Sequence, residues 1–177
     1  MAEETITPTR RICATAEVHH RLLEDPEYQR RRMRVENFAL RAVPLTGVVD
    51  VDVVVHIVLK NPTVITDAQV RTQIDVLNED YSARNADVTS VPSVWTGTVG
   101  NAEIRFNLAK KDPSGNSTSG ITRTTTSVSS FSTDDSVKFA GKGGQDAWDT
   151  ARYLNFWVCV LSGGNLNLDQ LNGLRWN

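Results

Sequence analysis

The feature that most constrains the fold is an almost unbroken apolar run from Val48 to Leu59, rich in valine and isoleucine. Asp50 and Asp52 near its start and His56 within it are its only polar interruptions. β-Branched residues favour strands, and successive apolar positions indicate that the second half of the strand is buried on both faces. No run reaches the ~18 apolar residues of a transmembrane helix.

An amphipathic helix is predicted directly after this strand. Thr66 is placed to cap its N-terminus, with Gln69 three residues later as the capping-box partner. Apolar residues then recur at helical spacing and predict one buried face, formed by Val70, Ile74, Leu77 and Tyr81.

Three further strands are predicted. Residues 102–108 alternate apolar and polar, residues 121–126 form a short β-prone stretch, and residues 153–161 are strongly apolar. The order strand, helix and three strands predicts an α/β or α+β fold with one mixed, twisted sheet.

The first part of the chain, up to about residue 43, differs in composition, because eight arginines and five acidic residues lie between Arg10 and Arg41. It reads as two short helices separated at Asp25-Pro26, since proline disfavours helix in the residue before it. The arginines from Arg30 to Arg34 read as a solvated helix face, with binding of nucleic acid or another acidic surface as the alternative. The net charge of −2 gives no general case for nucleic-acid binding. We therefore expect a helical region at 1–43, a main domain at 44–164 and a divergent tail at 165–177.

Few side chains offer chemistry. Cys13 lies near several arginines, which favour a thiolate, and it is either a reactive or metal-binding thiol or an idle small residue. The adjacent His19 and His20 would point about 100° apart on a helix, so they are poor joint ligands for one metal. His56 is expected to be either a core residue or a residue on the surface of the sheet. Cys159 is either a free core thiol or half of a disulfide.

The sequence contains no His-Glu-x-x-His motif, no phosphate-binding glycine loop and no nucleophile elbow. Gly141-Lys142-Gly143-Gly144 lacks the P-loop spacing and reads as a turn. No catalytic residue is therefore assigned from the residues themselves.

Several segments, in this order, together resemble the pappalysin-type zinc metalloproteases of the metzincin clan. RRICATAEVHHRLLEDPEY resembles the family's prosegment. VVVHIVLK, ITDAQVRTQIDVLNEDYSARNAD, AEIRFNLA, DPSGNSTSGITRTTT, FSTDDSVKF and GGQDAWDTARYLNFWVCVLSGG resemble its upper catalytic subdomain. The resemblance covers about residues 10–164, and the Gly-Ile-Thr-Arg and Tyr-Leu-Asn-x-Trp-Val-Cys runs are its most specific parts.

The resemblance implies a twisted sheet with a backing helix, preceded by a helical prosegment. It implies a secreted endopeptidase that acts on peptides or proteins through zinc, with calcium as a further metal. It also implies that Cys13 is the prosegment thiol that caps the zinc, although Ala14 stands where the family has glycine. From the residues alone, a disulfide of Cys159 with Cys13 has no support, and if the protein is extracellular the partner of Cys159 is expected outside these 177 residues. No nucleic acid or membrane is implied as a partner, and the oligomeric state is left open.

The sequence departs from the family after Gly164. It continues as NLNLDQLNGLRWN, without the zinc helix and its general-base glutamate. Zinc-dependent hydrolysis needs three protein ligands and a carboxylate base, so we expect these 177 residues to bind no catalytic zinc and to be inactive, as a truncated form. The alternative is a stand-alone, prosegment-like module that inhibits a related protease.

The N-terminus MAEETITPTRR shows no basic region followed by an apolar stretch, so no secretory signal is visible. Either the protein is cytosolic, or a signal has been removed, or the start is wrongly assigned.

Overall fold

The computed structural model describes residues 15–40 and 47–162, and Cys13 and the tail at 165–177 lie outside these ranges. The chain divides into two compact units, one that contains the first two helices and one that contains the sheet. No helix in the described ranges is long and apolar enough to span a bilayer.

The first unit contains α1 (Thr15–Leu23) and α2 (Pro26–Ala39). The break between them is at the predicted place: the Asp25 side chain accepts a hydrogen bond from the Glu27 N–H (2.8 Å), and Pro26 opens α2. The arginines of α2 are exposed, as expected of a solvated face. Two of them pair with acidic residues one turn away, Arg31 with Glu27 and Arg32 with Glu36.

The second unit is built around one long strand, β1 (Val49–Leu59). Its other regular elements are α3 (Asp67–Tyr81), β2 (Ile104–Leu108), β3 (Ile121–Thr125) and β4 (Leu154–Cys159). Short 3-10 turns lie at Pro62–Val64, Ala86–Ser90, Ser93–Thr98, Ser136–Lys138 and Ala140–Lys142. The predicted strand and helix segments are thus confirmed, with ends that differ by at most two residues.

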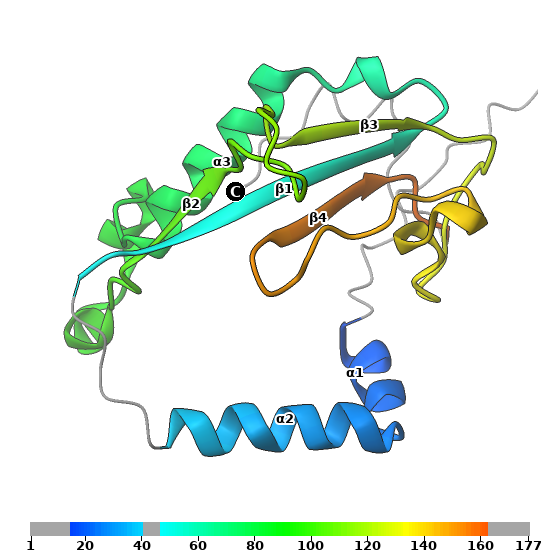
Figure 1. Ribbon diagram of the computed structural model, residues 1–177. Coiled ribbons are helices and arrows are strands. Elements are labelled where there is room, and N and C mark those ends of the chain that lie inside the picture. Colours follow the sequence, from blue (N-terminus) through cyan, green and yellow to red (C-terminus); the bar gives the residue numbers. More distant parts are fainter. Residues whose placement is uncertain (1–14, 41–46, 163–177) are drawn as a thin grey trace, which may run out of the picture. The chain divides into compact units, whose positions relative to one another are not determined.

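All three shorter strands pair with β1, and each pairing is parallel. The Ala109 N–H donates to the Val53 carbonyl, while the Val55 N–H donates to the Gly120 carbonyl. The backbone N–H and C=O groups of residues 53 and 55 point to the same edge of β1, so β2 and β3 lie end to end along that edge. β4 therefore pairs with β1 along the other edge. Figure 1 shows β3 and β4 on opposite sides of β1.

The predicted fold class, helices with one twisted sheet, is confirmed. The sheet was expected to be mixed, but its described strands pair only in parallel. Antiparallel pairing among the described residues occurs only in the isolated bridge between Lys111 and Ser117. A local apolar pattern specifies a strand but not the direction of its partner, so this difference could not be read from the sequence.

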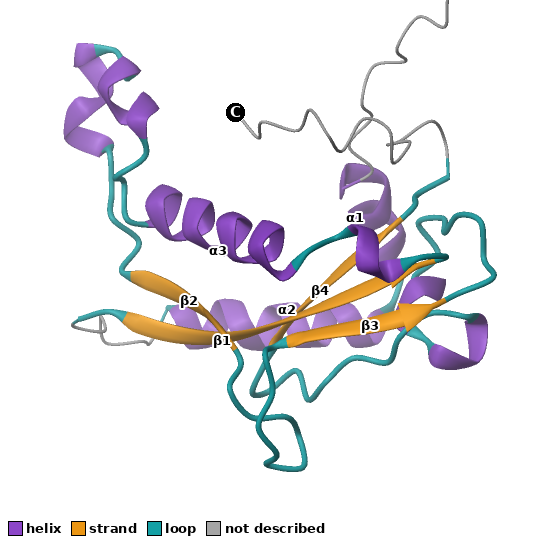
Figure 2. Cartoon of the chain, turned by 90° about the horizontal axis from the view of Figure 1, so that it is seen from above, coloured by secondary structure: helices purple, strands orange, loops and turns teal. Residues whose placement is uncertain are grey.

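The two faces of β1 are covered differently. One face, which we call the helix face, lies on the side of the sheet along which α3 runs (Figure 2). There Tyr81 of α3 meets Phe106 of the neighbouring strand β2 edge to face, with ring centroids 4.9 Å apart. The opposite face, which we call the loop face, carries Val54, His56 and Val58. It is covered by the segment from residue 126 to residue 153. Every residue from Val53 to Leu59 is therefore buried, as the apolar run predicts.

Candidate functional site

A buried histidine occupies the centre of the loop face. His56 has no exposed surface and lies between two tryptophans, with ring centroids 5.2 Å from Trp157 and 6.2 Å from Trp148. Of the two expectations for His56, a core residue or a sheet-surface residue, the structure shows the first. Because β1 pairs on both edges at this position, the ring can reach side chains of both neighbouring strands.

Both ring nitrogens of His56 have partners. Nε2 lies 2.9 Å from Oδ1 of Asn155 on β4, and Nδ1 lies 2.7 Å from the Thr122 hydroxyl on β3. An amide oxygen only accepts, so Nε2 carries the proton and Nδ1 of the neutral ring accepts from the hydroxyl. Burial holds the pKa of His56 below its ordinary value, and the hydrogen bond to Asn155 opposes that shift only in part.

The orientation of the Asn155 amide is fixed by its other bonds. Its Oδ1 also accepts from the Trp148 N–H (2.7 Å), and its Nδ2 donates to the carbonyls of Trp148 and Tyr153 (3.1 Å each). One amide therefore joins β4, the loop that carries Trp148 and the histidine of β1.

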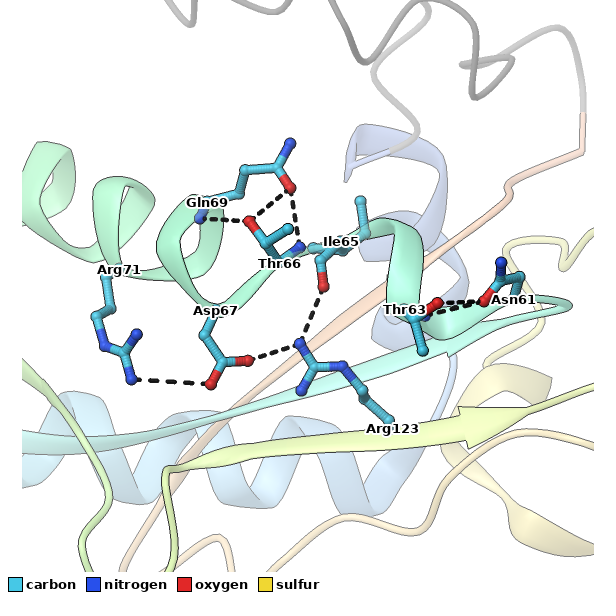
Figure 3. A network of polar contacts seen from close by, with 8 residues as sticks. All are labelled: Asn61, Thr63, Ile65, Thr66, Asp67, Gln69, Arg71 and Arg123. Atoms are coloured by element: carbon cyan, nitrogen blue, oxygen red, sulfur yellow. Dashed lines mark hydrogen bonds and ion pairs between the residues drawn. The ribbon is translucent and has the colours of Figure 1, made fainter.

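A second polar network secures the start of α3 on the helix face (Figure 3). Thr66 and Gln69 form the predicted capping box, with the Gln69 N–H donating to the Thr66 hydroxyl (3.2 Å). Arg123 of β3 donates to the Ile65 carbonyl (2.9 Å) and to the Asp67 carboxylate (2.6 Å). A strand arginine thus fixes both the residue before the helix and the carboxylate of its first turn, where the helix dipole favours negative charge.

The other end of α3 is secured by an amide. The Asn78 side chain accepts from the Phe106 N–H (2.7 Å) and donates to the Phe106 carbonyl (2.9 Å), so it occupies the place of a neighbouring strand. An open depression of about 490 Å³ lies beside it and includes Arg84 and Arg105. Arg105 is held by Asp50, and the Arg84 Nε donates to Ser82. Among the described residues that line this depression, no buried polar side-chain atom lacks a hydrogen-bond partner.

The described residues do not fit a zinc ion. No group of three His, Cys, Asp or Glu side chains in the described ranges is placed to hold a metal. Both ring nitrogens of His56 are hydrogen-bonded. The Nδ1 of His19 lies 3.4 Å from the Tyr28 hydroxyl, and His20 is exposed on α1. We therefore derive no chemical step through a metal for these residues.

The structure describes the surroundings of only one of the two cysteines, Cys159. Cys159 is a free, half-buried thiol in a cluster that includes Val58 and Phe131, and burial raises its pKa. Such a thiol is a poor nucleophile at neutral pH. Its pairing with a cysteine outside this sequence stays a prediction, as does the zinc-capping role of Cys13, which lies outside the described ranges.

Sequence reasoning did not assign roles to Thr122, Arg123, Asn155 or Asn78. Three of them lie inside the two runs that carry the family resemblance most specifically: Thr122 and Arg123 in Gly-Ile-Thr-Arg, and Asn155 in Tyr-Leu-Asn-x-Trp. Polar residues inside two β-prone segments were therefore the available signal.

Solved structures of other proteins resemble this chain. Mirolysin in complex with a compound is 50% identical, with a TM-score of 0.64, over 66% of this chain and 44% of its own. Tannerella forsythia mature mirolysin with a cleaved peptide is 49% identical, with a TM-score of 0.63, over 70% and 46%. A mutant of Tannerella forsythia promirolysin is 41% identical, with a TM-score of 0.71, over 83% and 50%.

This chain thus spans half or less of the mirolysin structures that it matches. No protein-family profile and no curated protein matches its sequence. The similarities support the fold and the metzincin-type metalloprotease part of the resemblance.

Proposed function

We propose that this chain supplies the prosegment and the sheet scaffold of a pappalysin-type zinc metalloendopeptidase. The observation that carries the proposal is the 50% identity to mirolysin over 66% of the chain, at a TM-score of 0.64. The promirolysin match, which covers 83% of the chain, supports the assignment of a prosegment.

In this proposal residues 1–43 are the prosegment, residues 44–164 are scaffold, and residues 165–177 diverge. Peptide-bond hydrolysis would require zinc ligands and a general base that the 177 residues do not present in a metzincin pattern. The chain alone is proposed to be inactive and to bind no catalytic zinc. Its intact relatives are proposed to act outside the cell on peptides or proteins, with zinc as the catalytic metal and calcium as a further ion.

The contribution of the described residues is to hold the scaffold in one arrangement. Arg123 and Asn78 fix the two ends of α3 against the sheet, and His56 joins the three strands on the loop face. A rigid sheet and backing helix are what a metal-bearing helix needs in order to be positioned precisely enough for catalysis.

Two proteins test this proposal. The 177-residue chain, incubated with zinc, dialysed and assayed with a quenched fluorescent peptide, should retain no stoichiometric zinc and show no hydrolysis that a chelator abolishes. A chimera that joins residues 1–162 to the remaining part of mirolysin should retain zinc and show chelator-sensitive cleavage. A chimera that folds by circular dichroism but binds no zinc would refute the scaffold role.

The same chimera tests Cys13. If its thiol caps the zinc, the unprocessed chimera should be latent, and Cys13→Ala should make it active without removal of the prosegment. Equal activity of the two unprocessed proteins would contradict this role. The alternative function, inhibition of a related protease by the isolated chain, has no described contact in its favour.

A further inference from the structure

His56 joins three strands through the side chains that surround it, Thr122, Trp148, Asn155 and Trp157, which we call the cage. Thr122 belongs to β3 and Asn155 to β4, and these strands contact β1 along opposite edges. Together the two bonds match the neutral ring with its hydrogen on Nε2, whereas a protonated ring keeps the bond to Asn155 but requires the Thr122 hydroxyl to turn from donor to acceptor. The ring is also closed off by Trp148 and Trp157 and has no exposed surface.

No charge in the cage is placed to balance a protonated ring. The titratable groups on β3, on β4 and in the segment from residue 126 to residue 153 are Arg123, Asp134, Asp135, Lys138, Lys142, Asp146, Asp149, Arg152, Tyr153 and Cys159, and β1 itself carries Asp50 and Asp52 at its start. Burial and the hydrogen bond to Asn155 are the influences on the pKa of His56, and no charged side chain is among them. Lys142 lies over the Phe139 ring, and Arg152 lies over the Tyr153 ring.

Arg123 points to the opposite face, where it binds Ile65 and Asp67. Lys138 lies over the Trp157 ring and pairs with Asp135.

The two aspartates accept backbone N–H groups of their own loop, Asp146 from Ala140 and Asp149 from Ala151. The Tyr153 hydroxyl donates to the Lys111 carbonyl. A proton on Nδ1 would therefore create an uncompensated buried charge, even if the Thr122 hydroxyl reversed its role and accepted it.

We propose that His56 is an acid-sensitive tie: the sheet forms only around its neutral ring, and proton uptake in mildly acidic solution releases β3 and β4 from β1. The folded domain is thereby confined to neutral and alkaline solution. This device is independent of the proposed protease function, since it needs neither zinc nor substrate.

The direction of the pH dependence follows from linkage. The pKa of His56 is lowered in the folded state, so the unfolded chain binds the extra proton and stability rises with pH in this range. The contribution is complete above the ordinary histidine pKa of about 6.5 and is lost as the pH falls below it. Because one proton is involved, the unfolding equilibrium constant should rise by up to about tenfold for each unit by which the pH falls.

The test is equilibrium urea unfolding of the full chain between pH 7.5 and pH 5. The chain has three histidines, so the His19→Gln/His20→Gln double variant leaves His56 as its only one. Wild type and this control should both show the rise in the unfolding constant, and His56→Gln should remove it. A flat wild-type profile, or an equal rise in His56→Gln, would overturn the proposal.

A spectroscopic measurement covers the case in which His56→Gln does not fold. In the double variant, nitrogen-15 spectra of the labelled imidazole should show the Nε2–H tautomer at every pH at which the protein is folded. The charged form should appear only together with the unfolded chain. A ring that takes up its proton within the folded state near pH 6.5 would overturn the proposal.

Discussion

Gly144 is the position at which the packing of the loop face can be tested most sharply. A Cβ at this residue would lie 2.1 Å from the carbonyl oxygen of Val137 and 2.5 Å from its carbonyl carbon. Both are backbone atoms, so no side-chain rotation can relieve the overlap, and one of the two segments must move by about 1 Å.

The cost of Gly144→Ala can be estimated from the bonds that such a movement strains. Overpacking a buried position costs about 1–3 kcal/mol. The Val137 carbonyl also accepts the Gln145 N–H (2.9 Å), and loss of that bond adds about 1 kcal/mol. Replacing glycine lowers the entropy of the unfolded chain and returns about 0.4–1 kcal/mol. We expect a net loss of about 2–3 kcal/mol.

Gly141→Ala is the matched control, because nothing lies within 4 Å of a Cβ there and the residue is exposed. It should change stability by no more than about 0.5 kcal/mol. Urea unfolding followed by tryptophan fluorescence measures both variants, since Trp157 donates to the Gln145 carbonyl (2.9 Å) beside the altered residue. A Gly144→Ala protein within 1 kcal/mol of wild type would refute the packing described for this segment.

Two further predictions concern the helix face and the exposed start of β1. Asn78→Ala leaves the N–H and carbonyl of Phe106 without their partners and should cost about 2 kcal/mol in urea unfolding; a loss below about 0.5 kcal/mol would contradict the strand-like role of this amide. The hydrogen bonds from Arg105 and then Asn107 lower the pKa of Asp50 to about 2, so Arg105→Gln should raise that pKa in a carboxyl NMR titration. The stability that this pairing contributes should be present above the ordinary aspartate pKa and lost as the pH falls toward 2, and an unchanged Asp50 titration in the variant would count against it.

The elements of this fold were predictable because their signals are local. The valine-rich run specified β1, and the spacing of Thr66 and Gln69 specified the start of α3 together with its capping box. The break between the first two helices followed from Asp25-Pro26. In each case neighbouring residues alone determine the structure, through side-chain shape or a bond across one turn.

The site was predictable only in part, because its bonds join distant positions. His56 was expected in the core or on the sheet surface, and its partners could not be foreseen, because Thr122 lies 66 residues away and Asn155 lies 99 residues away. A lone threonine or asparagine in a β-prone segment gives no sign of which side chain it will meet. The parallel direction of the strands was hidden for the same reason, since pairing is a property of the assembled sheet.

The position of β1 as the common neighbour of three strands has a consequence for how the chain folds. In the described ranges β2, β3 and β4 each pair with β1, so none of these pairings forms until a loop of many residues has closed. Such non-local contacts slow folding, and here they depend on a single template strand. A substitution that weakens β1 should therefore retard the formation of the whole sheet.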